Sequence, residues 1–429
     1  MSKIKFIKAR QILDSRGHPT VEVDILTTNN ILGRASVPSG SSKGEQEAFE
    51  LRDNEKDSFL GMSVSQAIKN VNNIIAPELI GKSVLDQFHI DRLMLELDGT
   101  KNKKRLGANA ILAISLANAK AASKEVGLPI YQYIGGSYSH ILPIPLVNVV
   151  NGGKHSNISI AFQEFMIVPI KAKNFFESLH IVYNIFYHLK NFLNEKGYST
   201  NVGDEGGFSP NFEKIENILD IILENIHLSG YEPYDEVGIA IDCAASELYE
   251  NKKYNYSKFN RDQKKDPLLK SSEDHVQYLS FLSRKYPIIS IEDGMDQNDW
   301  KGWKLLTDEL GDKIQLVGDD IFVTQIDNLR RGVNNGIANS ILIKINQVGT
   351  LTETMNTIDF AKKSGYKNVI SHRSGETEDH FISDLSVAFN IEQIKIGSIC
   401  RSERTSKYNQ LLRIEEDLGK RSVYPNWIF

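Results

Sequence analysis

Short apolar runs alternate with longer amphipathic runs along this sequence from residue 139 onward. Short apolar runs are typical of buried strands, and apolar residues spaced three and four apart, as at Ile215, Ile218 and Ile222, are typical of helices. Strands that alternate with helices predict a mainly parallel sheet with crossover connections. The predicted strands comprise residues 141–150, 164–169, 237–242, 288–293, 314–319, 340–345, 368–371 and 393–397.

The number and spacing of these strands predict a barrel. About eight strands alternating with helices match a (β/α)8 barrel, and an open doubly wound sheet is the alternative. Earlier in the chain, residues 21–25 alternate apolar and acidic side chains like a half-buried strand, and the Ala-rich residues 107–122 predict a helix. A chain of 429 residues exceeds the roughly 250–300 residues that one hydrophobic core serves. We therefore predict a smaller α+β domain over 1–138 and the barrel over 139–429.

Composition and charge narrow the class of function. A net charge of −5 argues against nucleic acid as a direct partner, although local cations could still bind a small anionic substrate. The only cysteines, Cys243 and Cys400, cannot form a disulfide framework, which favours a reducing cytosol. The sequence contains no signal-peptide pattern and no apolar run of about 20 residues, so we expect no membrane span.

Charged residues lie within or just after six of the predicted strands, where each apolar run ends. A buried strand gains no stability from ending in charge, because each ion removed from water costs several kcal/mol unless it is paired. Any one of these charges could be solvated in its own loop. In a barrel, however, all six positions meet at the carboxyl-terminal rim, where active sites are built. The six residues are Asp242, Glu292, Asp319, Lys344, Arg373 and Lys395.

These charges predict a metal site beside a cationic site. Three clustered carboxylates would repel one another, and a hard cation such as Mg²⁺ removes that penalty. The cations suit a substrate with carboxylate or phosphate groups. Lys344 beside a metal ion would have a lowered pKa, which permits general-base chemistry. The turn at 203–207 adds two acids. It could be an ordinary acidic turn, but on the rim its Glu205 could act as a general acid.

Several segments, in order along nearly the whole chain, resemble those of the enolase family. The most specific are residues 371–379 (SHRSGETED) and 202–208 (VGDEGGF). The others are 14–23 (DSRGHPTVEV), 107–112 (GANAIL), 163–166 (QEFM), 290–294 (SIEDG), 317–320 (VGDD), 343–349 (IKINQVG) and 413–416 (RIEE). The SIEDG and VGDD forms are similar to those of bacterial members.

The resemblance implies a modified (β/α)8 TIM-like barrel and a smaller α+β N-terminal domain with a mobile active-site loop. It implies a Mg²⁺-dependent, reversible dehydration of 2-phosphoglycerate to phosphoenolpyruvate, a step of glycolysis and gluconeogenesis. Lys344 would be the base and Glu205 the acid. Two Mg²⁺ ions per site are implied, one held by carboxylates and one arriving with the substrate. The implied metal ligands are Asp242, Glu292, Asp319 and Ser39, and the implied substrate-binding residues are His155, Gln163, Glu164, His372, Arg373, Ser374 and Lys395.

The resemblance also sets expectations about partners and location. It implies a homodimer, with an octamer as the alternative, and some members of the family also join an RNA-degrading assembly. We expect a cytoplasmic protein, with a secondary cell-surface or secreted presence as in other bacterial enolases.

Two loops depart from the family pattern. Residues 39–44 (SGSSKG) carry Lys43, which adds a cation beside the closing loop. Residues 154–161 (KHSNISIA) keep His155 but lose the usual acidic character. Every expected acid, base and metal ligand is present, which favours an active enolase over two alternatives. These are another acid dehydratase of the same superfamily, and a binding protein that has lost activity.

Overall fold

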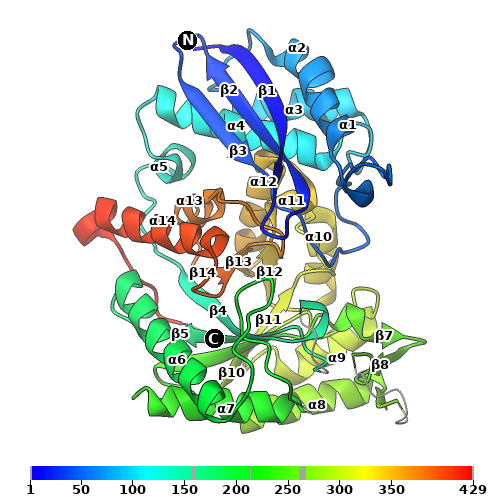
Figure 1. The fold of residues 1–429 in the computed structure, drawn as a ribbon, viewed down its shortest axis with the longest axis vertical. Helices are drawn as coiled ribbons and strands as arrows, with labels where there is room; N and C mark the ends of the chain where they lie inside the picture. The colour runs from blue at the N-terminus through cyan, green and yellow to red at the C-terminus, as the bar shows by residue number, and fades with distance from the viewer. Residues whose placement is uncertain (1, 156–159, 213, 260–266, 428–429) are drawn as a thin grey trace.

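The computed structural model describes residues 2–155, 160–212, 214–259 and 267–427. Its N-terminal part contains an antiparallel sheet, at the top of Figure 1, formed by β1 (Ile4–Leu13), β2 (Pro19–Thr27) and β3 (Leu32–Ser36). The helices that accompany this sheet are α1 (Ser65–Asn70), α2 (Ala76–Leu79), α3 (Gln87–Asp98), α4 (Ala108–Glu125) and α5 (Ile130–Gly135). This part therefore has the α+β character expected from the sequence.

Helix α4 packs unusually close to the sheet. Its alanine-rich sequence has small side chains on every face, and nearly all of them are buried. An added Cβ at Gly33 of β3 would lie 2.2 Å from the carbonyl oxygen of Ala117, so a side chain at this position would prevent the approach. Helix α4 confirms the helix predicted over residues 107–122.

The second part of the chain forms a closed barrel of eight strands, which confirms the predicted fold class. In order around the barrel, each strand is hydrogen-bonded to the next, and all pairs are parallel except those made by β5. The strands are β4 (Ile144–Asn151), β5 (Glu164–Pro169), β6 (Val237–Asp242), β10 (Ile288–Glu292), β11 (Gln315–Gly318), β12 (Ser340–Ile343), β13 (Lys367–Ser371) and β14 (Gln393–Gly397).

Strand β5 runs antiparallel to both of its neighbours, β4 and β6. Apolar patterning marks a buried strand but says nothing about its direction, so residues 164–169 alone could not reveal this reversal. The resemblance to enolases did imply a modified barrel. Because of the reversal, the start of β5 and the ends of the other strands lie at the same rim.

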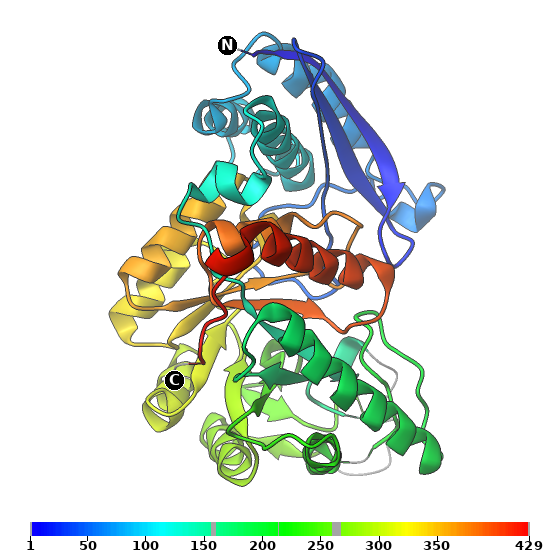
Figure 2. The same cartoon turned by 90° about the vertical axis from the view of Figure 1, so that its left-hand side faces the viewer.

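Helices surround the barrel, and Figure 2 shows the N-terminal sheet and helices gathered at one end of the molecule. The surrounding helices are α6 (Phe175–Glu195), α7 (Ile215–Leu228), α8 (Ser272–Lys285), α9 (Trp300–Leu310), α10 (Ile326–Asn335), α11 (Ile345–Val348), α12 (Leu351–Lys363), α13 (Phe381–Ala388) and α14 (Ser402–Leu418). A small sheet of β7 (Tyr249–Glu250), β8 (Lys253–Asn255) and β9 (Leu269–Lys270) was not predicted. No helix among the described residues has the length and apolar character to cross a membrane.

The buried His275 of α8 fastens the loop that follows β10. Its Nε2 lies 2.6 Å from the carbonyl oxygen of Gly294, its Nδ1 lies 2.7 Å from the hydroxyl of Tyr256, and its ring stacks on Tyr254 at 4.2 Å between centroids. Because a carbonyl oxygen only accepts, Nε2 donates to Gly294 and Nδ1 accepts from the tyrosine hydroxyl. Burial lowers the pKa of His275 to about 4.

This histidine is expected to make the free energy of unfolding depend on pH. In the unfolded chain an ordinary histidine binds a proton near pH 6.5, whereas folded His275 stays neutral down to about pH 4. The unfolded state therefore binds more protons between these values, and stability falls as pH falls from 6.5 to 4, by up to about 3 kcal/mol. Urea unfolding at pH 7 and pH 5 would measure this loss. The His275→Gln variant should lose less stability over the same interval, and an equal loss in both proteins would contradict the assignment.

Candidate functional site

The charged residues predicted at the strand ends meet at one rim of the barrel. Glu292, the last residue of β10, pairs in register with Asp242, the last residue of β6. Asp242 also pairs with Glu164, the first residue of β5, because that strand runs in the opposite direction. Three carboxylates from neighbouring strands are thereby held at the same level of the barrel, and all three are buried.

Lys395 of β14 joins these three carboxylates. Its Nζ lies 2.8 Å from Glu292 Oε2, 3.0 Å from Asp242 Oδ2 and 3.1 Å from Glu164 Oε1. Burial alone would lower the pKa of Lys395, but Asp242 and the two glutamates raise it well above its ordinary value. The ammonium group is therefore firmly cationic.

Two carboxyl groups of the site have pKa values that are raised above their ordinary values. Burial, and then repulsion from Asp242, raises the pKa of Glu292 to about 8. Burial, and then the charge of Glu205, raises the pKa of Glu164 well above its ordinary value. These shifts identify a crowded anionic site whose electrostatic cost an additional cation would relieve.

Lys344 follows β12 and forms a buried ion pair with Asp319, which follows β11. Burial opposes ionisation of Asp319, but Lys344 is close enough to hold the pKa of this carboxyl below its usual range. Burial would likewise lower the pKa of Lys344, yet Asp319 raises it. We expected a lowered pKa for Lys344 from a neighbouring metal ion. In the structure its nearest partner is a carboxylate, which has the opposite effect.

Asp319 also belongs to a second acidic cluster. One carboxylate oxygen from each of Asp293, Asp319 and Asp320 lies within 4.8 Å of the other two. Asp293 accepts the backbone N–H groups of Asp319 and Asp320 at 2.9 and 3.0 Å, so its carboxylate already fixes the turn after β11. Of the three residues, only Asp319 was predicted as a metal ligand.

The third cluster of the rim contains Glu164, Glu205 and His372. Glu205 is buried in the turn of residues 203–207, where Gly203 N–H donates to Gly207 and Gly206 N–H donates to Gly203. Its Oε1 lies 3.9 Å from His372 Nε2, and its Oε2 accepts a 3.5 Å hydrogen bond from Asn148 of β4. Burial lowers the pKa of His372 well below its ordinary value, so the imidazole is neutral.

A cavity of about 20 Å³ lies between these groups. It brings together nine predicted site residues, together with Ser42 and Ser371. The nine are Gln163, Glu164, Glu205, Asp242, Lys344, His372, Arg373, Ser374 and Lys395. Glu292 and Asp319 adjoin the cavity through Lys395 and Lys344, respectively.

Comparison with known families agrees with the motifs and with the barrel. Residues 4–134 match the model of the enolase N-terminal domain, and residues 139–427 match that of the enolase C-terminal TIM barrel domain. The chain belongs to the enolase family. This membership supports a lyase-type enzyme that acts on a small anionic substrate with the help of a divalent metal ion.

In this enolase family member, the loop of residues 39–47 lies against Arg373. Ser42 accepts a hydrogen bond from the guanidinium at 2.8 Å, and Glu47 accepts two at 3.1 and 3.2 Å. An added Cβ at Gly40 would lie 1.8 Å from the guanidinium, so a side chain there would displace either the loop or the arginine. Sequence reasoning missed Glu47, because a glutamate in a polar loop carries no signal of an inward partner.

The predicted metal ligand Ser39 lies at the start of this loop. Its backbone forms a two-way bridge with Gly375, and its hydroxyl accepts a 3.1 Å hydrogen bond from Arg52. The atypical Lys43 forms a 2.6 Å ion pair with Glu50, which Arg52 also contacts at 2.7 Å. In this chain the extra lysine therefore ties the loop to the segment behind it.

The second loop contains His155, a predicted substrate-binding residue, and the atypical Lys154. The side chain of His155 and residues 156–159 lie outside the described residues, so the role of His155 stays a prediction. Lys154 forms a 3.1 Å ion pair with Glu247. This loop lacks the acidic character that is usual in enolases, and an ion pair joins it to the segment after β6.

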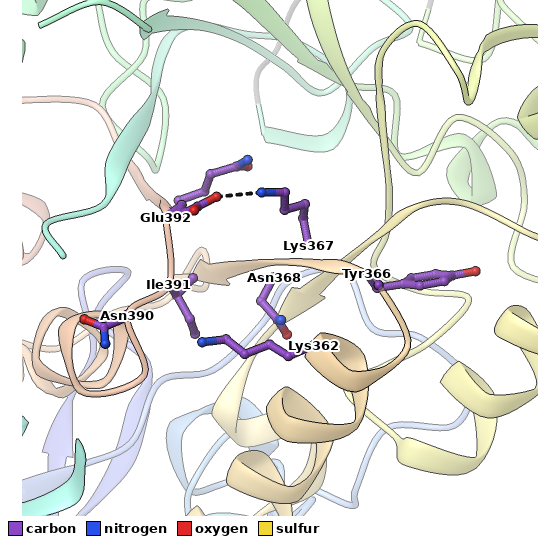
Figure 3. A pocket seen from close by; sticks show the side chains of 9 residues that line it. Lys362, Tyr366, Lys367, Asn368, Asn390, Ile391 and Glu392 are labelled. Carbon is purple, nitrogen blue, oxygen red and sulfur yellow. Dashed lines mark hydrogen bonds and ion pairs between the residues drawn. The ribbon is translucent and has the colours of Figure 1, made fainter. Parts of the chain in front are cut away.

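A larger cavity, of about 300 Å³, lies at the opposite end of the enolase barrel, where β13 and β14 begin. Figure 3 shows Lys367 paired with Glu392 across it, at 2.7 Å, and Lys362 on the adjoining helix α12. Its cations are thus already paired or bonded to backbone, since Lys362 donates to the carbonyl of Phe389. This end of a barrel serves stability rather than chemistry, and Lys367 offers a control position for experiments on the rim.

Proposed function

We propose that this chain is an enolase that reversibly dehydrates 2-phosphoglycerate to phosphoenolpyruvate. The observation that carries the proposal is the rim cavity, which a candidate base, a candidate acid and two cations line together. They are Lys344, Glu205, Arg373 and Lys395. Dehydration beside a carboxylate requires removal of a weakly acidic α-proton and protonation of a leaving hydroxide, so it needs both a base and an acid.

We assign each group one part of this reaction. Lys344 would remove the α-proton, and Glu205, in the turn beside His372, would protonate the leaving hydroxide. Arg373 has the planar guanidinium that binds a phosphate with two parallel hydrogen bonds, and the Ser374 hydroxyl lies next to it in sequence. Lys395 would face the substrate carboxylate, while Gln163 and Glu164 complete the wall of the cavity.

The carboxylates of the rim fit a divalent cation. Asp242, Glu292 and Asp319 offer only oxygen donors, which Mg²⁺ prefers, and the raised pKa of Glu292 reflects its burial and then the negative charge of Asp242. These three side chains would hold one Mg²⁺, and Ser39 would contribute to a second that arrives with the substrate. A bound divalent cation would stabilise the negative charge that develops on the substrate carboxylate.

Loop movement is part of the proposal. A three-carbon phosphate ester is larger than a cavity of about 20 Å³. Residues 39–47 would therefore leave Arg373 to admit the substrate and then close over it. We retain the division into a capping domain, 1–138, and a barrel, 139–429, because this loop belongs to the first and the reacting groups belong to the second.

Ultraviolet absorbance of the enol ester product offers a direct test. With 2-phosphoglycerate and Mg²⁺ we expect absorbance to rise, to stop rising after EDTA is added, and to resume when Mg²⁺ is restored in excess, because the carboxylates need the cation. The Lys367→Ala variant should behave like the unmodified protein, since residue 367 lies at the far end of the barrel. Folded protein that stays inactive with excess Mg²⁺ would contradict the proposal.

A panel of substrates separates the remaining alternatives. Turnover of acid sugars without turnover of 2-phosphoglycerate would identify another dehydratase of the superfamily. Tight binding of 2-phosphoglycerate without turnover would identify an inactive binding protein.

A further inference from the structure

Arg404, near the start of α14, is completely buried beside the proposed acid site. Its guanidinium donates to the backbone carbonyls of Arg373 and Ser374, each at 2.6 Å, and of Asp204 at 3.3 Å. The same group is hydrogen-bonded to Nδ1 of His372. Its nearest carboxylate belongs to Glu403, whose Oε1 lies 3.4 Å from Nε. A buried cation is thus directed at an imidazole and at backbone carbonyls.

The contact with Nδ1 determines where His372 carries its proton. An arginine side chain has five N–H donors, no acceptor, and a charge that it keeps in proteins. Its partner atom must therefore be an acceptor, so Nδ1 is unprotonated. A neutral imidazole has one N–H, and in His372 this proton must lie on Nε2.

The groups around His372 keep the ring neutral. Burial is the largest influence that lowers its pKa, and the charges of Arg404, Lys395 and Lys344 act in the same direction. Glu205 alone among these neighbours opposes them. A neutral ring with its proton on Nε2 is then the only form consistent with the contacts.

This tautomer decides what His372 presents to Glu205. Nε2 lies 3.9 Å from Glu205 Oε1, so an N–H there points a donor at the carboxyl group and at the space beside it. The other tautomer would direct a lone pair at an oxygen, which is repulsive. The same proton also prevents Nε2 from ligating a metal ion, because a metal ligand needs a free lone pair. Glu164, Glu205 and His372 are therefore better suited to proton transfer than to metal binding.

Glycine at position 397 makes this arrangement possible. An added Cβ at Gly397 would lie 2.9 Å from Glu205 O, 3.1 Å from Arg404 Cδ and 3.2 Å from His372 Cε1. Its φ of +94° also disfavours any other residue. The end of β14 therefore brings the acid, the imidazole and the guanidinium together.

We propose that Arg404 is a positioning residue that fixes His372 as the Nε2–H tautomer, so that this N–H faces Glu205 and is available to donate to the leaving hydroxyl group. Its catalytic consequence rests on the proposed dehydration, whereas the tautomer itself does not. By also bonding to Asp204, Arg373 and Ser374, Arg404 joins the loop of the acid to the loop of the phosphate contacts.

Nitrogen NMR of the unmodified protein tests the tautomer without any substrate. The chain has 10 histidines, and loss of one pair of ring signals in His372→Gln assigns those of residue 372. At neutral pH we expect the shift of an unprotonated nitrogen at Nδ1 and of an N–H at Nε2. A proton on Nδ1, or on both nitrogens, would overturn the proposal.

Two variants test the role of the arginine. Arg404→Lys keeps a cationic donor and should keep the tautomer. Arg404→Met removes the donor and should give mixed or Nδ1–H signals, with dehydration lowered by about 10²-fold and α-proton exchange lowered much less. Equal loss of both reactions, with an unchanged tautomer, would show a merely structural role. If Arg404→Met does not fold, the spectra of the unmodified protein and of Arg404→Lys decide.

The outcomes also separate this inference from the proposed function. The expected tautomer in a protein that does not turn over 2-phosphoglycerate would overturn the function and leave the positioning role intact. The opposite tautomer in an active enzyme would overturn only the role of Arg404.

Discussion

Replacing Lys344 with alanine is expected to lower both α-proton exchange and formation of phosphoenolpyruvate, each by up to about 10⁴-fold. The side chain lines the rim cavity. Lys395 also lines it, but that lysine is paired with three carboxylates. Without a base at this position the α-proton has no acceptor. Exchange of deuterium from solvent into 2-phosphoglycerate, followed by NMR, measures this step separately from dehydration.

A matched control is available in the same chain. Lys103 is also a buried lysine in an ion pair, 2.9 Å from Glu353, but this pair lies outside the residues that line the rim cavity. Lys103→Ala removes the same atoms and should leave exchange intact. Retention of exchange in folded Lys344→Ala would show that another group is the base. Urea unfolding of both variants measures the cost of leaving one carboxylate without its partner.

Replacing Glu205 with glutamine is expected to block dehydration by about 10²- to 10⁴-fold while α-proton exchange continues. Glutamine has nearly the same shape and still forms hydrogen bonds, but it cannot deliver a proton to the leaving hydroxide. The proposed base, Lys344, is unchanged, so the α-proton should still leave and return. Parallel assays of exchange and of product absorbance measure the two reactions on one sample.

Glu353→Gln serves as the control for this second variant, since it makes the same change in the Lys103 pair away from the rim. It should retain both reactions. Equal loss of exchange in Lys344→Ala and Glu205→Gln would contradict the division of labour, and retained dehydration in Glu205→Gln would move the acid role to Glu164 or His372.

The strands of the barrel were predictable because their cause is local. Each buried strand needs a short apolar run, and such runs at 237–242, 288–293 and 340–345 correspond to β6, β10 and β12. The charges that follow them were also informative, since a rim that gathers six charges is costly unless it serves chemistry. Both signals lie in a few consecutive residues.

Other features depend on partners far away in sequence and could not be predicted. The pairing of Lys395 with three carboxylates follows from closure of the barrel, and the contact of Glu47 with Arg373 spans more than 300 residues. Arg404 lies in a polar stretch that resembles an ordinary exposed helix, although its side chain is fully buried. Nothing near it in sequence indicates a partner at His372.

The contacts of Arg373 mean that the protein carries an internal mimic of its proposed substrate. The carboxylate of Glu47 and the carbonyl of Ser42 satisfy the guanidinium donors that a phosphate group would otherwise occupy. On the proposed role of Arg373, substrate binding would be an exchange of one oxygen ligand for another at this guanidinium. The affinity for a phosphate ester reports the difference between these two ligands, and the arginine is not left buried and unpaired between rounds of turnover.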